Sequence, residues 1–310
     1  MLTGGSLTTP AFTVLSPIKA ALKPSFLTNT LPRIGDEDLK AQLEVIASSS
    51  TPTNYTFPSS LLLAVASKDM KVLDLSSFQL YNRFEGELDA WQLNESYDSF
   101  LKRLRPSTST IYNVGPWIWV ENPHIPPPKI RPNMQGMIDR CQNILSEVAT
   151  FRTKTEKELQ GKPKSTISRK LNPKRNELPE AIARAAVEAK CTSGKWMLFP
   201  PVGEVDAIWR TVVEETIEGR FGPTSKVATD GGDGKNERLI CVYTKDFSDK
   251  ADVRRVLDAL VNVGLVRDDG AARSIWYKSD VYTHMNINSD NEYGLKASIY
   301  GSATMLKEAA

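Results

Sequence analysis

The stretch GKWMLFPPVGEVDAIWRTVVEETI, residues 194–217, decides the fold. A short apolar run from Lys195 to Phe199 is closed by Pro200 and Pro201, which is typical of a strand that ends in a turn. The apolar residues that follow recur at steps of three and four, which predicts one face of a long helix. These residues are Val205, Ile208, Trp209, Val212, Val213, Thr216 and Ile217.

The chain after this segment repeats the alternation of strand and helix. Strands are predicted at about 225–229 and 238–244, joined by a glycine-rich turn over 230–236. A second helix begins near Ser248, which suits an N-cap, and ends at Gly264; strand character resumes at 274–278. The order strand–helix–strand–strand–helix–strand places both helices on one face of a largely antiparallel sheet. We therefore expect an α+β fold.

Upstream of this core the sequence predicts one more strand and three helices. The strand runs from about Tyr112 to Val120, and the helices cover about 88–104, 133–150 and 177–189, the last starting near Pro179. Residues 152–175 lie between two of these helices and hold nine Lys and Arg against two Glu. Such a run is usually a solvated linker or loop, and the alternative is a phosphate-binding arm.

The domain organisation follows from composition. Residues 1–53 are predicted to be a largely disordered tail with a short helix at 36–47, a flexible tail being favoured over a transit peptide. Residues 54–310 are predicted to form a single domain, with short buried segments of unassigned type at 61–66 and 71–75. The whole chain is 40% hydrophobic and 25% charged, which is ordinary for a protein with a packed core.

Bulk properties exclude several classes of protein. The net charge is only +2, so any binding of phosphate must come from a local patch. The three widely spaced cysteines argue against a disulfide framework or a zinc site and favour buried thiols. No apolar run approaches the length of a membrane span. We expect a cytoplasmic protein, with the nucleus as a second compartment, that needs no cofactor, metal or membrane.

Four spaced motifs carry a resemblance to a known family: GKWMLF at 194–199, SKVAT at 225–229, ICVYTKDF at 240–247 and YKSDVYT at 277–283. They resemble the uncharacterised family of the basophilic-leukemia-expressed protein, and VGPWIWV at 114–120 is similar to its fungal members. The resemblance extends over about 91–300. It implies a fold like translation initiation factor 4E, the messenger-RNA cap-binding protein, with a curved antiparallel sheet and helices on its convex face.

The same comparison argues against binding of the messenger-RNA cap in the manner of factor 4E. Cap binding in factor 4E sandwiches a methylated guanine between two loop tryptophans, one of them beside an acid. The corresponding segments here, 122–135 and 180–193, contain no tryptophan, so the cap-sandwich residues cannot be carried over. The basic residues that contact phosphate in the 4E hairpin do have loose counterparts in Lys226, Lys235 and Arg238.

The candidate ligand-binding residues combine aromatic and basic side chains. Trp117 and Trp119 share one face of their strand, which is either core, the favoured interpretation, or a concave binding surface. For the basic side chains the favoured interpretation is a solvated hairpin edge with protective charges. The alternative is that Lys226, Lys235, Arg238 and Lys278 converge at one rim of the sheet to bind phosphate. Trp91, Trp196 and Trp209 are predicted to be core. The predicted site comprises Trp117, Trp119, Lys226, Lys235, Arg238, Lys278, Tyr282 and His284.

Three functions remain open from the sequence. The preferred one is non-enzymatic binding of RNA or a nucleotide-like ligand on the concave sheet face, without the standard cap sandwich. The first alternative is a protein-interaction module whose helical face binds a partner. The second is an enzyme acting on a nucleotide or phosphorylated metabolite through Lys278 and His284, with Asp280 orienting the histidine. A Walker-type loop is excluded, because Gly234-Lys235 precedes Asn236 and a strand.

Overall fold

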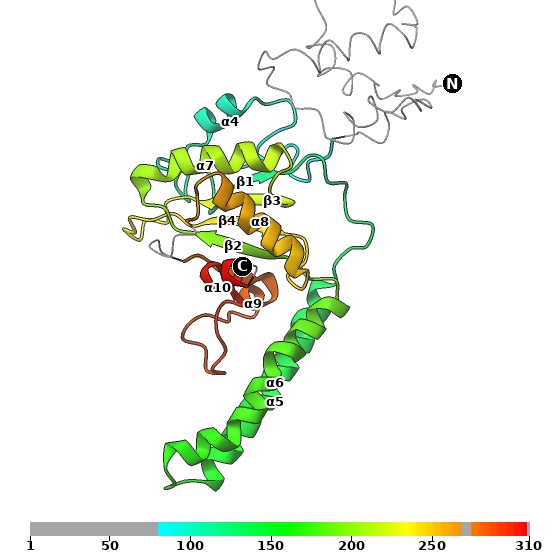
Figure 1. The fold of residues 1–310 in the computed structure, drawn as a ribbon, viewed down its shortest axis with the longest axis vertical. Helices are drawn as coiled ribbons and strands as arrows, with labels where there is room; N and C mark the ends of the chain where they lie inside the picture. Colours follow the sequence, from blue (N-terminus) through cyan, green and yellow to red (C-terminus); the bar gives the residue numbers. More distant parts are fainter. Residues whose placement is uncertain (1–79, 268–273, 309–310) are drawn as a thin grey trace, which may run out of the picture. The chain divides into compact units, whose positions relative to one another are not determined.

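The computed structural model describes residues 80–267 and 274–308, so the predictions for 1–53, 36–47, 61–66 and 71–75 lie outside the described residues. Within this part of the chain one sheet has the strand order β1-β3-β4-β2-β5-β6, and every neighbouring pair is antiparallel (Figure 1). The strands are β1 (Trp117–Glu121), β2 (Gly194–Leu198), β3 (Thr224–Ala228), β4 (Ile240–Thr244), β5 (Trp276–Ser279) and β6 (Tyr300–Gly301). The helices are α4 (Tyr97–Arg103), α5 (Met134–Glu158), α6 (Lys164–Glu188), α7 (Val202–Ile217), α8 (Lys250–Asn262), α9 (Asp280–His284) and α10 (Ser302–Lys307).

The predicted strand–helix–strand–strand–helix–strand core is confirmed as β2, α7, β3, β4, α8 and β5. Helices α7 and α8 lie on the same face of the sheet (Figure 1). That face is apolar because alternate strand residues point toward the helices. The Trp196 indole nitrogen, on β2, donates a hydrogen bond to the Val253 carbonyl of α8 at 3.0 Å, which fixes the helix over the sheet.

The buried tryptophans and cysteines were predicted correctly. Trp91, Trp196 and Trp209 all belong to the hydrophobic core. Cys141, Cys191 and Cys241 are buried free thiols. One glycine is required by this packing: a Cβ at Gly194 would lie 2.2 Å from the Tyr277 hydroxyl oxygen, which is hydrogen-bonded inside the core to Thr244. The GKW motif therefore begins with glycine because Tyr277 occupies the space of a side chain.

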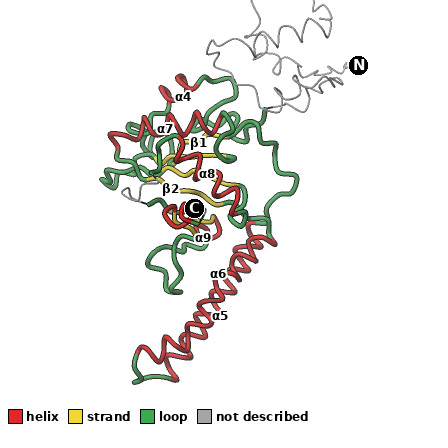
Figure 2. Tube along the Cα trace, viewed as in Figure 1, coloured by secondary structure: helices red, strands yellow, loops and turns green. Residues whose placement is uncertain are grey.

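The prediction of a linker or loop at residues 152–175 is wrong. This segment forms the end of α5, the turn at 159–163 and the first half of α6, and the two helices pack together as an antiparallel hairpin (Figure 2). Thr155 and Leu171 are buried between the helices and extend the apolar seam that begins at the base of the hairpin. Lys, Arg, Glu and Gln are good helix formers, so a sparse seam suffices. The predicted helix start at Pro179 is also wrong, because α6 continues through Pro173 and Pro179.

Two further boundaries differ from the predictions. Strand β1 begins at Trp117 rather than Tyr112, because Gly115 has a positive φ of 105° and Pro116 follows it. The helix predicted over 88–104 is confined to α4, with Ser96 as its N-cap. Residues 89–91 instead pair with β1: Trp119 donates to the Asp89 carbonyl, and Trp91 donates to the Trp119 carbonyl. The outer edge of the sheet is thereby occupied.

In the residues that the structure describes, no helix combines the length and the apolar character needed to cross a membrane. Over the same ranges, no group of three or more His, Cys, Asp and Glu side chains is arranged to hold a metal ion.

Candidate ligand-binding face

The candidate site lies on the sheet face opposite α7 and α8. On β1, Trp117 and Trp119 alternate with Ile118 and Val120, which are fully buried in the core. Trp119 lies opposite Lys226, and Tyr243 lies opposite Lys195, which in turn faces Lys278. We call this side of the sheet the indole face, defined by Trp117, Trp119, Lys195, Lys226, Tyr243 and Lys278.

Lys226 holds its ammonium group against three aromatic rings. Its Nζ lies 3.7 Å from the ring centroid of Trp117, 4.7 Å from that of Trp119 and 5.8 Å from that of Tyr243. Contacts of this kind contribute on the order of 0.5–2 kcal/mol each, depending on how much water is excluded. Both tryptophans are half-buried and stand outside the hydrophobic core. The interpretation of this pair as core is therefore wrong.

The rings of Trp117, Trp119 and Tyr243 form a band of aromatic side chains around Lys226, which we call the aromatic band. It continues into the loop of residues 81–95. The Phe84 ring lies 5.0 Å from the Trp119 ring, and the Arg83 guanidinium lies 4.6 Å above Phe84. The rings of Phe84 and Trp119 thus lie between the cations of Arg83 and Lys226. Lys195 extends the band on the other side, with its ammonium 5.5 Å from the Tyr243 ring. Aromatic rings combined with cations are the usual surface for single-stranded nucleic acid.

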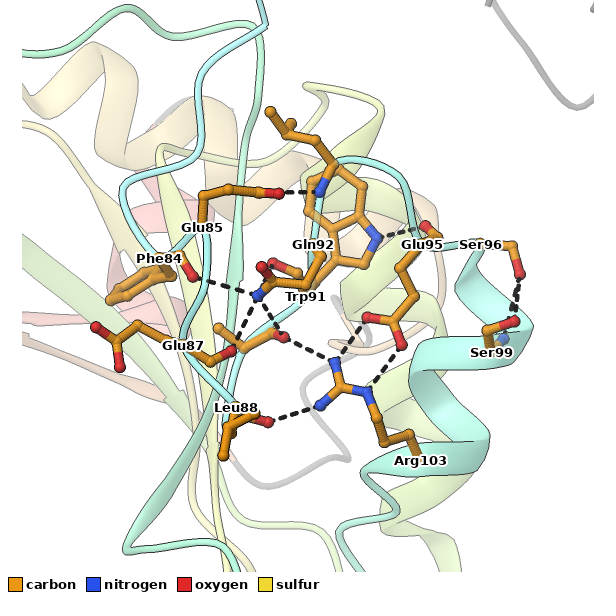
Figure 3. Close-up of polar contacts among 12 residues, drawn as sticks. Phe84, Glu85, Glu87, Leu88, Trp91, Gln92, Glu95, Ser96, Ser99 and Arg103 are labelled. Atoms are coloured by element: carbon orange, nitrogen blue, oxygen red, sulfur yellow. Dashed lines mark hydrogen bonds and ion pairs between the residues drawn. The ribbon is translucent and has the colours of Figure 1, made fainter. Parts of the chain in front are cut away.

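Two side chains hold the loop beside β1 (Figure 3). The Gln92 amide donates to the carbonyls of Phe84 and Glu87 at 3.2 and 3.0 Å, which closes the turn that presents Phe84. Arg103, from α4, makes a bidentate pair with Glu95 and also donates to the Ala90 carbonyl at 2.9 Å. These side-chain hydrogen bonds tie the loop backbone to itself and to α4, so the loop is a built part of the face.

A buried ion pair lies at the β2–β5 side of the indole face. The Lys195 ammonium contacts the Asp280 carboxylate and donates to the Thr283 hydroxyl at 2.8 Å, with only 6% of the lysine side chain exposed. Ser193 donates to the other oxygen of Asp280. Because Asp280 neutralises Lys195, the positive charge available to a ligand resides on other residues.

Of the three lysines on the indole face, Lys226 and Lys278 form no ion pair within the described residues, whereas Lys195 pairs with Asp280. Burial lowers the pKa of Lys226, and the charge of Lys195 lowers it further. The pKa of Lys278 is lowered by the same two causes in the same order. A lysine pKa is lowered when the ammonium group has lost hydration and no ion pair replaces it, which is the case for both residues. An anion that binds beside them would supply that compensation.

Glu121 ends β1 on the indole face, two residues after Trp119. Its side chain is 7% exposed, and the Arg83 Nε lies 3.2 Å from its carboxylate. Burial raises the pKa of Glu121 to about 7, although Arg83 and the Thr224 hydroxyl act in the opposite direction. The carboxyl therefore exchanges its proton near neutral pH, at the rim of the aromatic band.

Replacing Glu121 with glutamine should flatten the pH dependence of stability. Below about pH 4.5 the carboxyl is protonated in both states and has no effect. Between that pH and about 7 the unfolded state has lost the proton that the folded state keeps. The free energy of unfolding of the wild type should consequently fall by about 3 kcal/mol as the pH rises through this window. Urea denaturation across the window measures it.

The exposed Glu87→Gln provides the control for this experiment and should retain the wild-type pH dependence. If Glu121→Gln shows the same fall in stability as the wild type over this window, the carboxyl of Glu121 is not the group responsible.

Four of the predicted site residues do not join the aromatic band. Lys235 is exposed and pairs with Asp233 in the β3–β4 turn. Arg238 is buried, with its guanidinium 3.3 Å from Asp230 and donating to the Lys235 carbonyl at 2.9 Å. Tyr282 is buried in the core. His284 is exposed on α9, and within the described ranges no hydrogen bond joins it to Asp280.

The structure adds residues that sequence reasoning missed. These are Arg83, Phe84, Glu121, Lys195 and Tyr243. Tyr243 and Lys195 stand in strands that were predicted, but their place beside Lys226 depends on cross-strand register, which one sequence does not fix. No sequence signal distinguished Phe84 from an ordinary loop residue.

Taken together, the geometry defines a class: an α+β protein whose antiparallel sheet carries helices on one face and a cation–aromatic band on the other. A family model described as basophilic leukemia-expressed protein Bles03 matches residues 40–286. The chain belongs to this family, as the spaced motifs predicted.

Proposed function

We propose that this protein binds RNA or a nucleotide-like ligand on the indole face. A base stacks on Trp117 and Trp119, and the adjoining phosphate is held by Lys226 and Lys278. The observation that carries the proposal is the position of the Lys226 ammonium, 3.7 and 4.7 Å from two tryptophan rings that lie outside the core.

A nucleotide suits this arrangement because it offers an aromatic surface and an anion in one molecule. When a phosphate draws the Lys226 ammonium away from the rings, the indoles become free to stack on a base. Stacking contributes on the order of 1–3 kcal/mol per base and tolerates any sequence. The phosphate compensates the two ammonium groups for the hydration that burial removes. Binding thus replaces the internal cation–π contact of Lys226 with contacts between the protein and the ligand.

The two alternatives receive less support. The enzyme hypothesis needs Asp280 to orient His284, but the Asp280 carboxylate is engaged by Ser193 and Lys195. The hypothesis that a protein partner binds α7 and α8 is supported by no specific feature of the described residues. The likeness to translation initiation factor 4E is part of our proposal and is supported by the antiparallel sheet with α7 and α8 on one face. A cytoplasmic location, with access to the nucleus, belongs to it as well.

The variant Lys226→Gln with Lys278→Gln should bind a short fluorescein-labelled single-stranded RNA at least about tenfold more weakly than the wild type. Each phosphate contact contributes about 0.7 to the slope of log affinity against log salt for a single strand. Removing two contacts should therefore reduce the slope by about 1.4. Fluorescence anisotropy titrations between about 50 and 200 mM salt measure both quantities.

Lys102→Gln with Lys307→Gln is the matched control, because it makes the same change in net charge at exposed positions on α4 and α10. The control should bind like the wild type. Equal affinity and equal salt slope for all three proteins would refute the proposed function.

A further inference from the structure

The α5–α6 hairpin extends away from the sheet as a two-helix projection (Figure 1). Each helix has 25 residues, which corresponds to about 37 Å of helix at 1.5 Å per residue. The apolar seam between the helices is dense at the base, where both also contact α9. The buried residues of the base are Met137, Cys141, Leu145, Val148, Leu178, Ile182, Ala185 and Ala186.

The outer half of the hairpin, residues 152–175, differs from the base in both packing and charge, and we call it the basic arm. Its buried residues are Thr155 and Leu171. Interhelix attraction is supplemented by an ion pair of 2.7 Å between Lys170 and Glu158. These contacts keep the arm helical although it contributes little to the hydrophobic core.

Most of the positive charge of the basic arm is unpaired. The segment holds nine Lys and Arg against two Glu, and both glutamates are already engaged by Arg152 and Lys170. Five exposed cations form no ion pair within the described residues. They are Lys154, Lys157, Lys162, Lys164 and Arg169. Since like charges at short range repel, the arm is most stable when an external anion neutralises it.

The composition of the arm indicates which kind of anion. The large apolar residues exposed elsewhere in the described chain have no counterpart between 152 and 175. A protein interface needs buried apolar or aromatic anchors, and a membrane-bound helix needs an apolar face. A nucleic-acid backbone needs only cations, because the release of condensed counterions supplies the free energy. The basic arm therefore fits a polyphosphate chain.

A small hollow lies at the root of the arm, and its lining includes the rings of Phe151 and Tyr293 and the side chains of Arg152, Lys174, Arg175 and Glu292. The hollow is too small to admit a base, and two of its cations are engaged, because Arg152 pairs with Glu156 and Glu292 and Lys174 pairs with Glu177. The charge available to a phosphate backbone therefore lies on the five exposed cations of the arm rather than in the hollow.

We propose that the basic arm is a second RNA-contacting surface that binds the phosphate backbone without sequence preference. This inference rests on the proposed function, since the indole face and the arm would hold the same RNA chain. The indole face contributes stacking, and the arm contributes most of the salt-dependent affinity.

The test uses poly(U) RNA and a variant of the full chain in which Lys154, Lys157, Lys162, Lys164 and Arg169 are replaced by glutamine. The affinity of this arm variant for poly(U) should fall at least about tenfold, and the salt slope should fall by about 3.5 for five lost contacts. Glutamine is a good helix former, so circular dichroism should be unchanged. A variant with arginine at the four lysine positions keeps the charge and should bind like the wild type.

The matched control removes the same charge elsewhere, by glutamine at Lys102, Lys129, Arg131, Lys245 and Lys307, and should retain wild-type binding. Equal weakening in the control would overturn the inference, as would unchanged poly(U) binding by the arm variant. Loss of binding to phosphatidylserine vesicles with poly(U) binding unchanged would also overturn it and assign the arm to membranes.

The same titrations with Trp117→Ala and Trp119→Ala separate the two proposals. If the arm variant binds normally and the tryptophan variant does not, the basic arm is refuted while the indole face stands. If only the arm variant is weakened, the arm is supported and the indole face is refuted.

Discussion

Replacement of Trp196 by alanine should lower the free energy of unfolding by about 3–5 kcal/mol, a large part of the total stability of a typical domain. The side chain is fully buried on β2, between β4 and β5 at the centre of the sheet. It packs edge-to-face with Tyr277 at 5.3 Å and donates to the Val253 carbonyl. Its removal leaves a cavity beneath α8 and loses the hydrogen bond to Val253. Urea denaturation followed by circular dichroism measures the loss.

Trp276→Ala is the control, because Trp276 lies on the adjoining strand β5 but is 53% exposed. We expect it to change the free energy of unfolding by less than about 1 kcal/mol. A Trp196→Ala protein as stable as the control would contradict the assignment of Trp196 to the centre of the core.

The core of the fold could be predicted from sequence because its signals are local. The three- and four-residue spacing around Trp209 and the proline and glycine breaks specify each element without knowledge of its neighbours. The opposite burial of Trp276 and Tyr277 likewise follows from strand alternation.

The helical hairpin could not be predicted, because its outer half lacks a continuous apolar stripe. Residues 152–175 read as a solvated linker when each helix is considered alone. Their helical state depends on the antiparallel partner, which buries Thr155 and Leu171 and pairs Lys170 with Glu158. Tertiary contacts of this kind leave no periodic signal in either segment.

The candidate site was predicted only in part, for a related reason. Strand alternation is visible in the sequence, and it places Trp117 and Trp119 on one face of β1. The positions of Lys226 and Lys278 on the same side of the sheet depend on the register that the structure shows. The place of Arg238 was not visible, since the β3–β4 turn directs its guanidinium toward Asp230. Lys195 resembled a polar residue at the start of a core strand, and its pairing with Asp280 required the β2–β5 register.

Removal of both indoles, in Trp117→Ala with Trp119→Ala, should reduce the binding free energy for single-stranded RNA by about 2–6 kcal/mol. Two lost stacking platforms of about 1–3 kcal/mol each account for this range. The reduction corresponds to at least about a thirtyfold loss of affinity. Lys226 would also lose the rings that position its ammonium group. Phenylalanine at both positions retains a stacking surface and should recover much of the affinity.

The most direct test of the central claim is an anisotropy titration of one labelled single-stranded RNA with the wild type, the double-alanine variant and Tyr112→Ala at fixed salt. Tyr112 is 90% exposed just before β1 and serves as the aromatic control. Urea denaturation of the same samples must show that the variants are folded. We expect saturable binding by the wild type and Tyr112→Ala, and at least about a thirtyfold weaker curve for the double-alanine variant. Identical curves for the three proteins, or no binding by the wild type, would contradict the assignment of the indole face as an RNA-binding site.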